Sequence, residues 1–571
     1  MLRSLVGSEM CIRDRSGCSD ANSQSSASPV LAPETTRTVQ NGKIVGFVAD
    51  NGTHVWRGIP FAADTSGENR WRAPRRAPDW EGARSALEFS QACAQIATPF
   101  TQIDGWVDGE LEGSEDCLAL DIYAPADAAG RNLPVMVWIH GGSNVSGASQ
   151  LYVGDQLAAN EDVIIVAIQY RLGPLGWFSH QALRDTAETA EDKAANFAIL
   201  DQIAALRWVR DNIAGFGGNP SLVTIFGESA GGADVAGLLA SPLAKGLFHR
   251  AIIQSGFFDS ETRADAENAD SELDNPSSLV AKRLGGFDKF HSASTAEIFA
   301  AFELVDGFTE LPRMIQDGVS LPATPLRDAF SSTETFNAVP IMTGTNRDEN
   351  KLFFLFDERL VKRKFGRFIV RRNPDLYEAA SDFSGRNWRV RSVDWPAAQM
   401  AAAGHEDVYT YRFDWDEGGR FLWTDLSKIL GAAHGLEIPF VFNRFEFSKT
   451  ADPILFPKKT FQTRDALSRA MGAYWASFAR DGRPAAPGQP NWQPYSENNA
   501  LMFFDSTNDE GIRIVKGTDS IDAILDDLAV DTRIDKIERC VILSELYKID
   551  DAERLARAQA MDCPDNDEAS L

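Results

Sequence analysis

The chain has 571 residues, of which 44% are apolar, and its formal net charge is −26. This length and apolar content suffice for a large buried core, and the 35 Phe and 13 Trp exclude a chain that is disordered throughout. The acidic balance, without a basic stripe, argues against a nucleic-acid partner, and the short apolar runs predict no transmembrane span.

The N-terminal segment differs in composition from the rest of the chain. Residues 1–15 resemble the translation of a sequencing adapter, so we expect them to be an artefact that precedes the natural chain. Residues 16–40 are polar and Ser-rich, and they predict a disordered tether. Within the tether, Ser16-Gly17-Cys18 resembles the end of a bacterial lipoprotein signal peptide, which would make Cys18 a lipid-anchored first residue. An ordinary disordered tail is the alternative.

Strand and helix patterns alternate from residue 43 onward. Asn51-Gly52 between two short apolar runs predicts a β-hairpin. Further strands are predicted at 118–124, 134–139, 163–169, 222–226, 251–254, 339–343, 408–413 and 501–504, and helices at 197–213 and 465–480. This alternation favours an α/β fold with a large, mostly parallel central sheet covered by helices. We expect the domain to span 41–550, with helical cap-like insertions near 258–335 and 355–405, followed by a C-terminal tail at 551–571.

Four cysteines remain when the two N-terminal ones, Cys11 and Cys18, are set aside. Their spacing allows two local disulfides, Cys93 with Cys117 and Cys540 with Cys563. Each would stabilise the fold by roughly 3 kcal/mol, and four buried free thiols are the alternative. No metal-ligand spacing occurs, so no metal site is expected. Disulfides imply an oxidising compartment, so we expect an exported protein: a periplasmic or cell-envelope lipoprotein, or a secreted chain.

A G-x-S-x-G motif stands at 227–231 (GESAG) and contains the candidate nucleophile Ser229. A β-branched run precedes it and a small-residue helix start follows, which is the strand–turn–helix setting of a nucleophile elbow. The turn is so sharp that side chains two residues either side of the serine would collide. The helix N-terminus after the serine favours negative charge. A plain Gly-rich turn is the alternative.

The residues around this motif resemble a known family. Segment 216–231 (FGGNPSLVTIFGESAG) is similar to the signature of type-B carboxylesterases, which include cholinesterases and bacterial para-nitrobenzyl esterases. Segment 115–125 (EDCLALDIYAP) resembles a second signature, with Ala119 where the family usually has Tyr, Thr or Phe. The resemblance covers roughly residues 40–510. It implies an α/β-hydrolase fold and ester hydrolysis that needs no cofactor and no metal.

A glycine-containing loop at 138–142 (WIHGG) follows a predicted strand and is the candidate oxyanion hole. In an α/β-hydrolase one donor comes from this loop and one from the residue after the nucleophile. The candidates are the backbone amides of Gly142, Ser143 and Ala230. The family more often has a third glycine and then an aromatic where this chain has Ser143 and Asn144. If the loop needs a positive φ, Ser143 is expected to be strained by about 1–3 kcal/mol.

The general base is expected to follow the acid, because this fold places the triad in the order Ser, acid, His. Two of the seven histidines, His405 and His434, come late enough in the chain. His434 lies in a small-residue loop at 431–437 that resembles the family's histidine loop. His405 directly precedes a strand and is expected to be structural.

The supporting acid is expected in the loop 344–349 (GTNRDE), which follows a predicted strand. This loop resembles the family's acid loop, in which the last Glu belongs to the triad. The resemblance implies Glu349, with Asp348 as the alternative. Asn350 stands where the family usually has a small residue.

Together these residues predict a serine hydrolase that cleaves small-molecule carboxylic esters. Ser229 would form the acyl-enzyme, His434 would act as general base, and Glu349 would orient the imidazole. Glu228 and Glu437 are expected either near the triad or as structural ion-pair partners. The alternatives are a lipase, amidase or carbamate hydrolase of the same fold, and a non-enzymatic binding protein of that fold.

Overall fold

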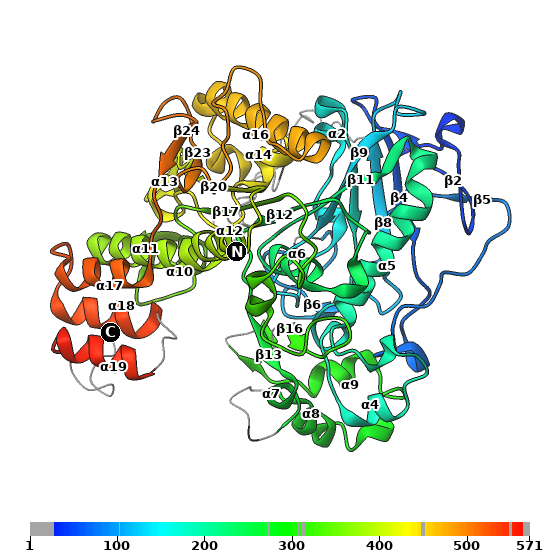
Figure 1. Ribbon diagram of the computed structural model, residues 1–571, viewed down its shortest axis with the longest axis horizontal. Helices are drawn as coiled ribbons and strands as arrows, with labels where there is room; N and C mark the ends of the chain where they lie inside the picture. The colour runs from blue at the N-terminus through cyan, green and yellow to red at the C-terminus, as the bar shows by residue number, and fades with distance from the viewer. Residues whose placement is uncertain are drawn as a thin grey trace, which may run out of the picture.

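The computed structural model describes residues 28–101, 103–268, 270, 275–305, 308–309, 314–446, 451–546 and 551–563. These residues form an 11-stranded central sheet (Figure 1). From one edge to the other its strands are β24 (Arg513–Lys516), β23 (Ala500–Phe504), β20 (Val408–Phe413), β17 (Ile341–Asn346), β12 (Arg250–Gln254), β11 (Gly218–Glu228), β9 (Leu133–Ile139), β10 (Ile164–Ile168), β8 (Ala119–Ala124), β4 (His54–Pro60) and β3 (Phe47–Val48).

The strands from β23 to β10 pair in parallel, and antiparallel strands complete both edges. Every residue of β9 and β10 is buried, as expected for continuous apolar strands that are covered on both faces. The predicted α/β fold with a mostly parallel sheet is therefore confirmed, and each predicted strand is present.

Helices cover both faces of the sheet. One face carries α5 (Phe197–Asn212) and α6 (Ala230–Ala240), and the other carries α2 (Asp155–Glu161), α14 (Ile438–Phe442) and α16 (Phe461–Asp481). Alternate side chains of β9 enter separate cores: Val137 joins the cluster on the α5 side, whereas Trp138 joins the cluster on the α16 side. This division follows from the period of two along a strand.

The first insertion contains strands that its sequence does not predict. Helices α7 (Arg263–Glu267), α8 (Ser277–Arg283) and α9 (Thr295–Ala300) lie among short strand pairs. These pairs are β13 (Ser260–Thr262) with β16 (Met314–Gln316), and β14 (Leu304–Val305) with β15 (Phe308–Thr309). Strands this short give no usable alternation in sequence.

The second insertion combines a hairpin with helices. Strands β18 (Val361–Lys364) and β19 (Phe368–Arg371) pair antiparallel. Helix α11 (Pro374–Arg389) follows and runs through a π-helical turn into α12 (Trp395–Ala402). The hairpin is a second departure from the expected helical character.

The remaining short elements are α3 (Gly173–Gly176), α4 (Gln181–Asp185), α10 (Lys351–Phe354), α13 (Leu426–Ile429), α15 (Asp452–Leu455), β6 (Gln95–Ile96), β7 (Leu111–Glu112), β21 (Arg420–Phe421) and β22 (Thr424–Asp425).

The expected N-terminal tether ends earlier than residue 40. Strand β1 (Arg37–Val39) pairs with β2 (Gly42–Val45), which also pairs with β5 (Ala83–Ser85). The Trp56 indole fixes this segment, because it donates a 2.7 Å hydrogen bond to the Thr35 carbonyl and lies 5.0 Å from the Arg37 guanidinium. The predictions for residues 1–15 and for Cys18 lie outside the described residues.

The C-terminal segment also differs from the expected tail. Helices α17 (Ile521–Val530), α18 (Lys536–Leu546) and α19 (Asp551–Ala560) form a lobe beside α11 (Figure 1). Apolar residues of α17 and α18 share a core with α11. The tail expectation is therefore wrong for 551–563, where a helix and a disulfide hold the chain.

The structure contains both candidate disulfides, Cys93–Cys117 and Cys540–Cys563. The second joins α18 to the residues that follow α19. Within the described ranges, no helix is long and apolar enough to cross a membrane. No cluster of His, Cys, Asp and Glu suited to a metal ion occurs among those residues either.

Candidate active site

Ser229 occupies the sharp turn between β11 and α6. Its backbone has φ 58° and ψ −123°, a conformation that L-residues rarely adopt. The flanking glycines are required by space. A Cβ on Gly227 would lie 2.5 Å from the Gly231 carbonyl oxygen, and one on Gly231 would lie 2.1 Å from the Ile139 carbonyl oxygen. The G-x-S-x-G motif thus forms the elbow that its sequence setting predicts.

The imidazole of His434 lies between a buried carboxylate and this elbow. Its Nδ1 lies 2.5 Å from Oε2 of Glu349, and its Nε2 lies 3.2 Å from Oε1 of Glu228, the residue before Ser229. Nε2 makes no hydrogen bond to any described residue, the Ser229 hydroxyl included. Catalytic hydrogen bonds are often long in unliganded enzymes and shorten when substrate binds. With the Nδ1 proton directed at Glu349, Nε2 is free to accept a proton.

The carboxylate of Glu349 is fully buried and strongly hydrogen-bonded. Its Oε1 accepts from the Ser255 hydroxyl at 2.6 Å, the Thr345 hydroxyl at 2.6 Å and the Asn346 N–H at 2.7 Å. These donors fix one oxygen and leave Oε2 for His434. Sequence reasoning did not identify these three residues. Thr345 and Asn346 stand in the quoted acid loop, but nothing in the sequence marks Ser255.

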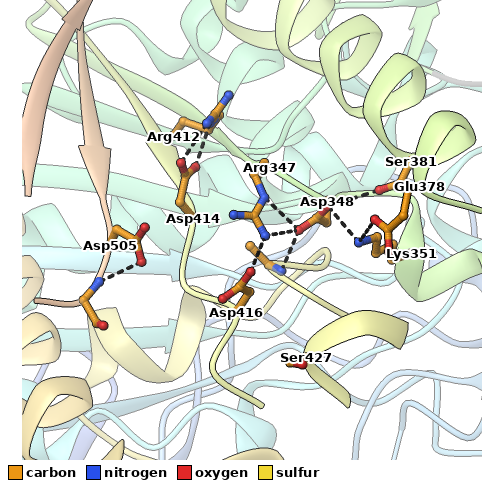
Figure 2. Close-up of polar contacts among 12 residues, drawn as sticks. Arg347, Asp348, Lys351, Glu378, Ser381, Arg412, Asp414, Asp416, Ser427 and Asp505 are labelled. Atoms are coloured by element: carbon orange, nitrogen blue, oxygen red, sulfur yellow. Dashed lines mark hydrogen bonds and ion pairs between the residues drawn. The ribbon is translucent and has the colours of Figure 1, made fainter. Parts of the chain in front are cut away.

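Asp348, the alternative acid, points toward two basic side chains, Arg347 and Lys351 (Figure 2). Its carboxylate forms ion pairs with Arg347 at 2.7 Å and with Lys351 at 3.1 Å, and it accepts the Ala432 N–H at 3.0 Å. It thereby ties the acid loop to the backbone of the histidine loop. Of the two neighbouring acids, only Glu349 contacts His434.

Three buried carboxylates surround the imidazole. Burial lowers the pKa of His434, but Glu228, Glu349 and Glu437 outweigh burial and raise it to about 9. Burial raises the pKa of Glu228 to about 8, and burial also raises the pKa of Glu437. Glu228 therefore raises the pKa of His434 only while it is itself ionised. The amides of Gln254 and Asn346 bind Glu437 at 3.0 and 2.7 Å.

We expect Glu228→Gln to move the acidic limb of the pH profile of kcat/KM to lower pH. This limb marks the pH below which His434 is protonated and cannot accept a proton. The amide keeps the size of the side chain but removes the negative charge of Glu228, which raises the pKa of His434. The profile is measured on a soluble ester, with Glu437→Gln as the comparison variant, for which a smaller shift is expected. A limb that stays in place would show that Glu228 is not ionised during catalysis.

The candidate oxyanion loop turns back through left-handed backbone. Gly142, Ser143 and Asn144 have φ values of 106°, 56° and 58°. A Cβ on Gly141 would lie 3.0 Å from Cβ of Ser229, so the loop lies directly against the nucleophile. Within the described chain, the N–H groups of Gly142, Ser143 and Ala230 donate to no protein acceptor. They can therefore donate to an incoming oxyanion.

The side chain of Asn144 is fixed by protein partners. Its amide donates to Asp234 at 3.1 Å, and its carbonyl oxygen accepts from the Tyr170 hydroxyl at 3.3 Å. Its backbone oxygen accepts the Gly173 N–H at 2.7 Å. These bonds, and the tolerance of Asn for left-handed backbone, explain how Asn144 is accommodated at a position where the family more often has an aromatic residue.

We expect Ser143→Gly to raise the free energy of unfolding by up to about 1 kcal/mol. Ser143 is exposed, and its backbone is held at a φ of 56°, which costs an L-residue about 1–2 kcal/mol. Glycine removes this strain, but its greater conformational entropy in the unfolded chain offsets part of the stabilisation. Chemical denaturation of both proteins measures the difference. A destabilised Ser143→Gly protein would contradict the strain assigned to this turn.

Aromatic residues line the imidazole. The Trp388 ring, from α11, lies 5.0 Å from the His434 ring, and the Phe353 ring, from α10, lies 5.5 Å from it. The Trp388 indole donates to the Ser255 carbonyl at 3.2 Å. Sequence reasoning identified neither aromatic. His405, expected to be structural, bonds the Val339 carbonyl at 2.8 Å and makes no contact with the site.

Comparisons with known proteins match most of the chain. A model of the carboxylesterase family matches residues 33–382 and 376–517. Para-nitrobenzyl esterase of Bacillus subtilis (strain 168) is 34% identical over 495 residues, which is 82% of this chain and 94% of the relative. Cocaine esterase of Homo sapiens is 33% identical over 529 residues, which is 84% of this chain and 88% of the relative.

Solved structures agree with these relatives. A PNB esterase structure is 30% identical with a TM-score of 0.68, covering 85% of this chain and 97% of its own. A carboxylesterase structure from Geobacillus stearothermophilus is 29% identical with a TM-score of 0.65, covering 84% of this chain and 97% of its own. The residues that the family model matches include the elbow, the acid loop and the histidine loop.

Proposed function

Because the chain belongs to the carboxylesterase family and is a carboxylic ester hydrolase, we propose that Ser229, His434 and Glu349 form the triad that cleaves its esters. The observation that carries this proposal is the position of the imidazole. Its Nδ1 bonds a buried carboxylate, and its Nε2 is left free beside the residue that precedes Ser229.

The reaction has two acyl-transfer steps. In the first, the Ser229 oxygen attacks the ester carbonyl while Nε2 of His434 takes the hydroxyl proton. The carbon–oxygen bond to the alcohol then breaks, and the alcohol leaves with that proton. In the second step His434 takes a proton from water as the water oxygen attacks the acyl carbon. The bond from that carbon to the Ser229 oxygen then breaks, His434 returns the proton to this oxygen, and the acid and free Ser229 are released. The carboxylate of Glu349 stabilises the imidazolium that forms in each step.

Backbone amides are proposed to stabilise the oxyanion of each tetrahedral intermediate. The candidates are the N–H groups of Gly142, Ser143 and Ala230, which have no acceptor among the residues that the structure describes. Loss of a single such donor costs a comparable enzyme about 3–4 kcal/mol in transition-state stabilisation. Because these donors are fixed in the turn and at the start of α6, they need little reorganisation during the reaction.

Covalent labelling tests the identity of the nucleophile. A fluorophosphonate should phosphonylate Ser229 and no other serine, because only an activated serine hydroxyl reacts at an appreciable rate. Peptide mass spectrometry of the labelled protein identifies the modified residue. A label on another serine, or none on an enzyme that still hydrolyses esters, would overturn the proposed triad.

We further propose that the protein works in an oxidising compartment outside the cytoplasm. Two disulfides in one chain are typical of such compartments. The resemblance of 16–18 to a lipoprotein cleavage site supports a lipid-modified Cys18 and hence a periplasmic or cell-envelope location. Mass spectrometry of the protein from its natural host should find a diacylglyceryl group on Cys18. An unmodified Cys18 would contradict the lipid anchor and favour the alternative, a secreted protein.

A further inference from the structure

Two β-hairpins outside the site meet at their tips and form one surface. Strands β18 and β19 turn at 365–367, and β21 and β22 turn at 422–423. The Thr424 hydroxyl donates to the Ile369 carbonyl at 3.1 Å, which joins the two hairpins. The Trp423 ring lies 5.2 Å from the ring of Phe365 and 5.0 Å from that of Phe368. We call these two tips, 362–368 and 420–423, the hairpin patch.

The patch displays large apolar side chains to solvent. Phe365 is 72% exposed, Leu422 58%, Trp423 43% and Phe421 36%. Scattered exposed apolar residues are common, but a contiguous group of them usually marks an interaction site. The adjoining rings of Phe365, Phe368 and Trp423 make this group contiguous.

The backbone at both tips makes this display more unusual. Phe365 has a φ of 53° and Leu422 a φ of 52°. Turns with left-handed backbone normally use Gly, Asn or Asp, which adopt it with little strain. An apolar side chain here is therefore unfavourable both in solvation and in conformation. The same combination occurs at two adjoining tips, which indicates that exposure of these side chains has a use.

Basic side chains surround the apolar ones. Lys362, Arg363, Lys364 and Arg367 on the first hairpin and Arg420 on the second are all exposed. Segment 361–372 contains no acidic residue. Within the part of the chain that the structure describes, Lys362, Arg363 and Arg367 form no ion pair. Lys364 instead places its ammonium 5.0 Å from the Trp423 ring.

We propose that the hairpin patch docks the protein on an anionic lipid bilayer. Phe365, Leu422 and Trp423 would enter the interfacial layer, where aromatic and aliphatic side chains beside Lys and Arg are favoured. The basic side chains would pair with lipid phosphates and carboxylates. The net charge of −26 opposes approach to such a surface, but screening limits this repulsion to about 8 Å at physiological ionic strength, so the local patch dominates on contact.

A second copy of the chain fits the patch less well. In a symmetric dimer the same surface would face itself, so the five basic side chains would lie against their own copies without anions between them. A lipid surface supplies both the apolar layer and the negative charge. The proposal is also independent of the catalytic assignment, because none of the patch residues contacts Ser229, His434 or Glu349 in the described structure.

Vesicle flotation of the full chain tests the proposal. Two kinds of vesicle are used at physiological ionic strength, one of phosphatidylcholine alone and one of equal parts phosphatidylglycerol and phosphatidylcholine. The protein should bind the anionic vesicles about ten-fold or more tightly than the neutral ones, and added salt should weaken that binding.

The sharpest variant is the double substitution Phe365→Asn and Leu422→Asn. Asn tolerates left-handed backbone, so both turns should remain, while the apolar side chains are lost. Binding to anionic vesicles should fall about ten-fold or more. The matched control is Phe287→Asn, which removes a 61% exposed Phe from the segment between α8 and α9. These two helices lie at the bottom of Figure 1, away from α13. This control should bind as the unaltered protein does.

Three results would overturn the proposal. The unaltered protein could fail to bind anionic vesicles, or the double variant could bind them equally well. The double variant could also convert a dimer to a monomer in sedimentation while vesicle binding is absent, which would assign the patch to a second copy. Hydrolysis of a soluble ester at an unchanged rate confirms that each variant is folded.

Substituting Lys362, Arg363 and Arg367 with Gln should also reduce the salt dependence of binding.

Discussion

Ser229→Ala should lower kcat by about 10⁶-fold, as in a comparable triad. The substitution removes the oxygen that attacks the ester and leaves the protein fold intact, because the Ser229 hydroxyl makes no hydrogen bond to another described residue. Substrate binding should persist, so KM should change little. What activity remains would come from the oxyanion donors acting on water.

The measurement compares kcat for a soluble p-nitrophenyl ester in the variant and the unaltered enzyme. Ser221→Ala is a suitable control, because Ser221 is an exposed serine on the same strand, β11. This control should retain full activity. If Ser229→Ala kept more than about one hundredth of kcat, another group would be the nucleophile and the proposed triad would be wrong.

The sequence predicts the site best where the chemistry is local. The nucleophile elbow depends partly on neighbours in sequence, because a Cβ on Gly227 would collide with the Gly231 carbonyl four residues later. Gly231 itself is excluded from carrying a Cβ by the Ile139 carbonyl of the neighbouring strand β9. The central strands were predictable for a similar reason, since each is a continuous buried apolar run. His434 and Glu349 were reached through a family resemblance rather than through spacing.

Groups that meet only in the folded chain were not predictable. Ser255 follows β12, and its hydroxyl reaches Glu349 because β12 and β17 are neighbours in the sheet. Trp388 arrives from an insertion, on α11, to lie beside His434. Neither residue has a local pattern that distinguishes it from an ordinary buried serine or tryptophan. The position of β1 was also not predictable, because the segment before it is fixed by a hydrogen bond from Trp56 to Thr35, a residue distant in sequence.

Asp348 and Glu349 show the limit of sequence reasoning most clearly. Both carboxylates are buried and adjacent, and the sequence left Asp348 as an alternative acid. The tight turn after β17 sends the two side chains in different directions. Asp348 forms ion pairs with Arg347 and Lys351 (Figure 2). Glu349 instead contacts the imidazole of His434. Substitution of each acid by its amide should therefore separate a catalytic effect from a structural one.

Glu349→Gln should lower kcat by about 10⁴-fold with little change in stability. The amide keeps the size of the side chain and its bonds to Ser255 and Thr345, but it cannot stabilise an imidazolium and can present an N–H to Nδ1, which favours the wrong tautomer of His434. Both kcat on a soluble ester and the free energy of unfolding are measured.

Asp348→Asn is the matched variant, and it should show the opposite pattern. Its kcat should stay within about ten-fold of the unaltered enzyme, because the hydrogen bond of Asp348 to the histidine loop goes to the Ala432 backbone and not to the imidazole. Its free energy of unfolding should fall by about 2 kcal/mol, because Lys351, which is 4% exposed, loses one of its two carboxylate partners. If Asp348→Asn lost as much kcat as Glu349→Gln, the imidazole would depend on the whole acid loop rather than on one carboxylate, and the role assigned to Glu349 alone would be wrong.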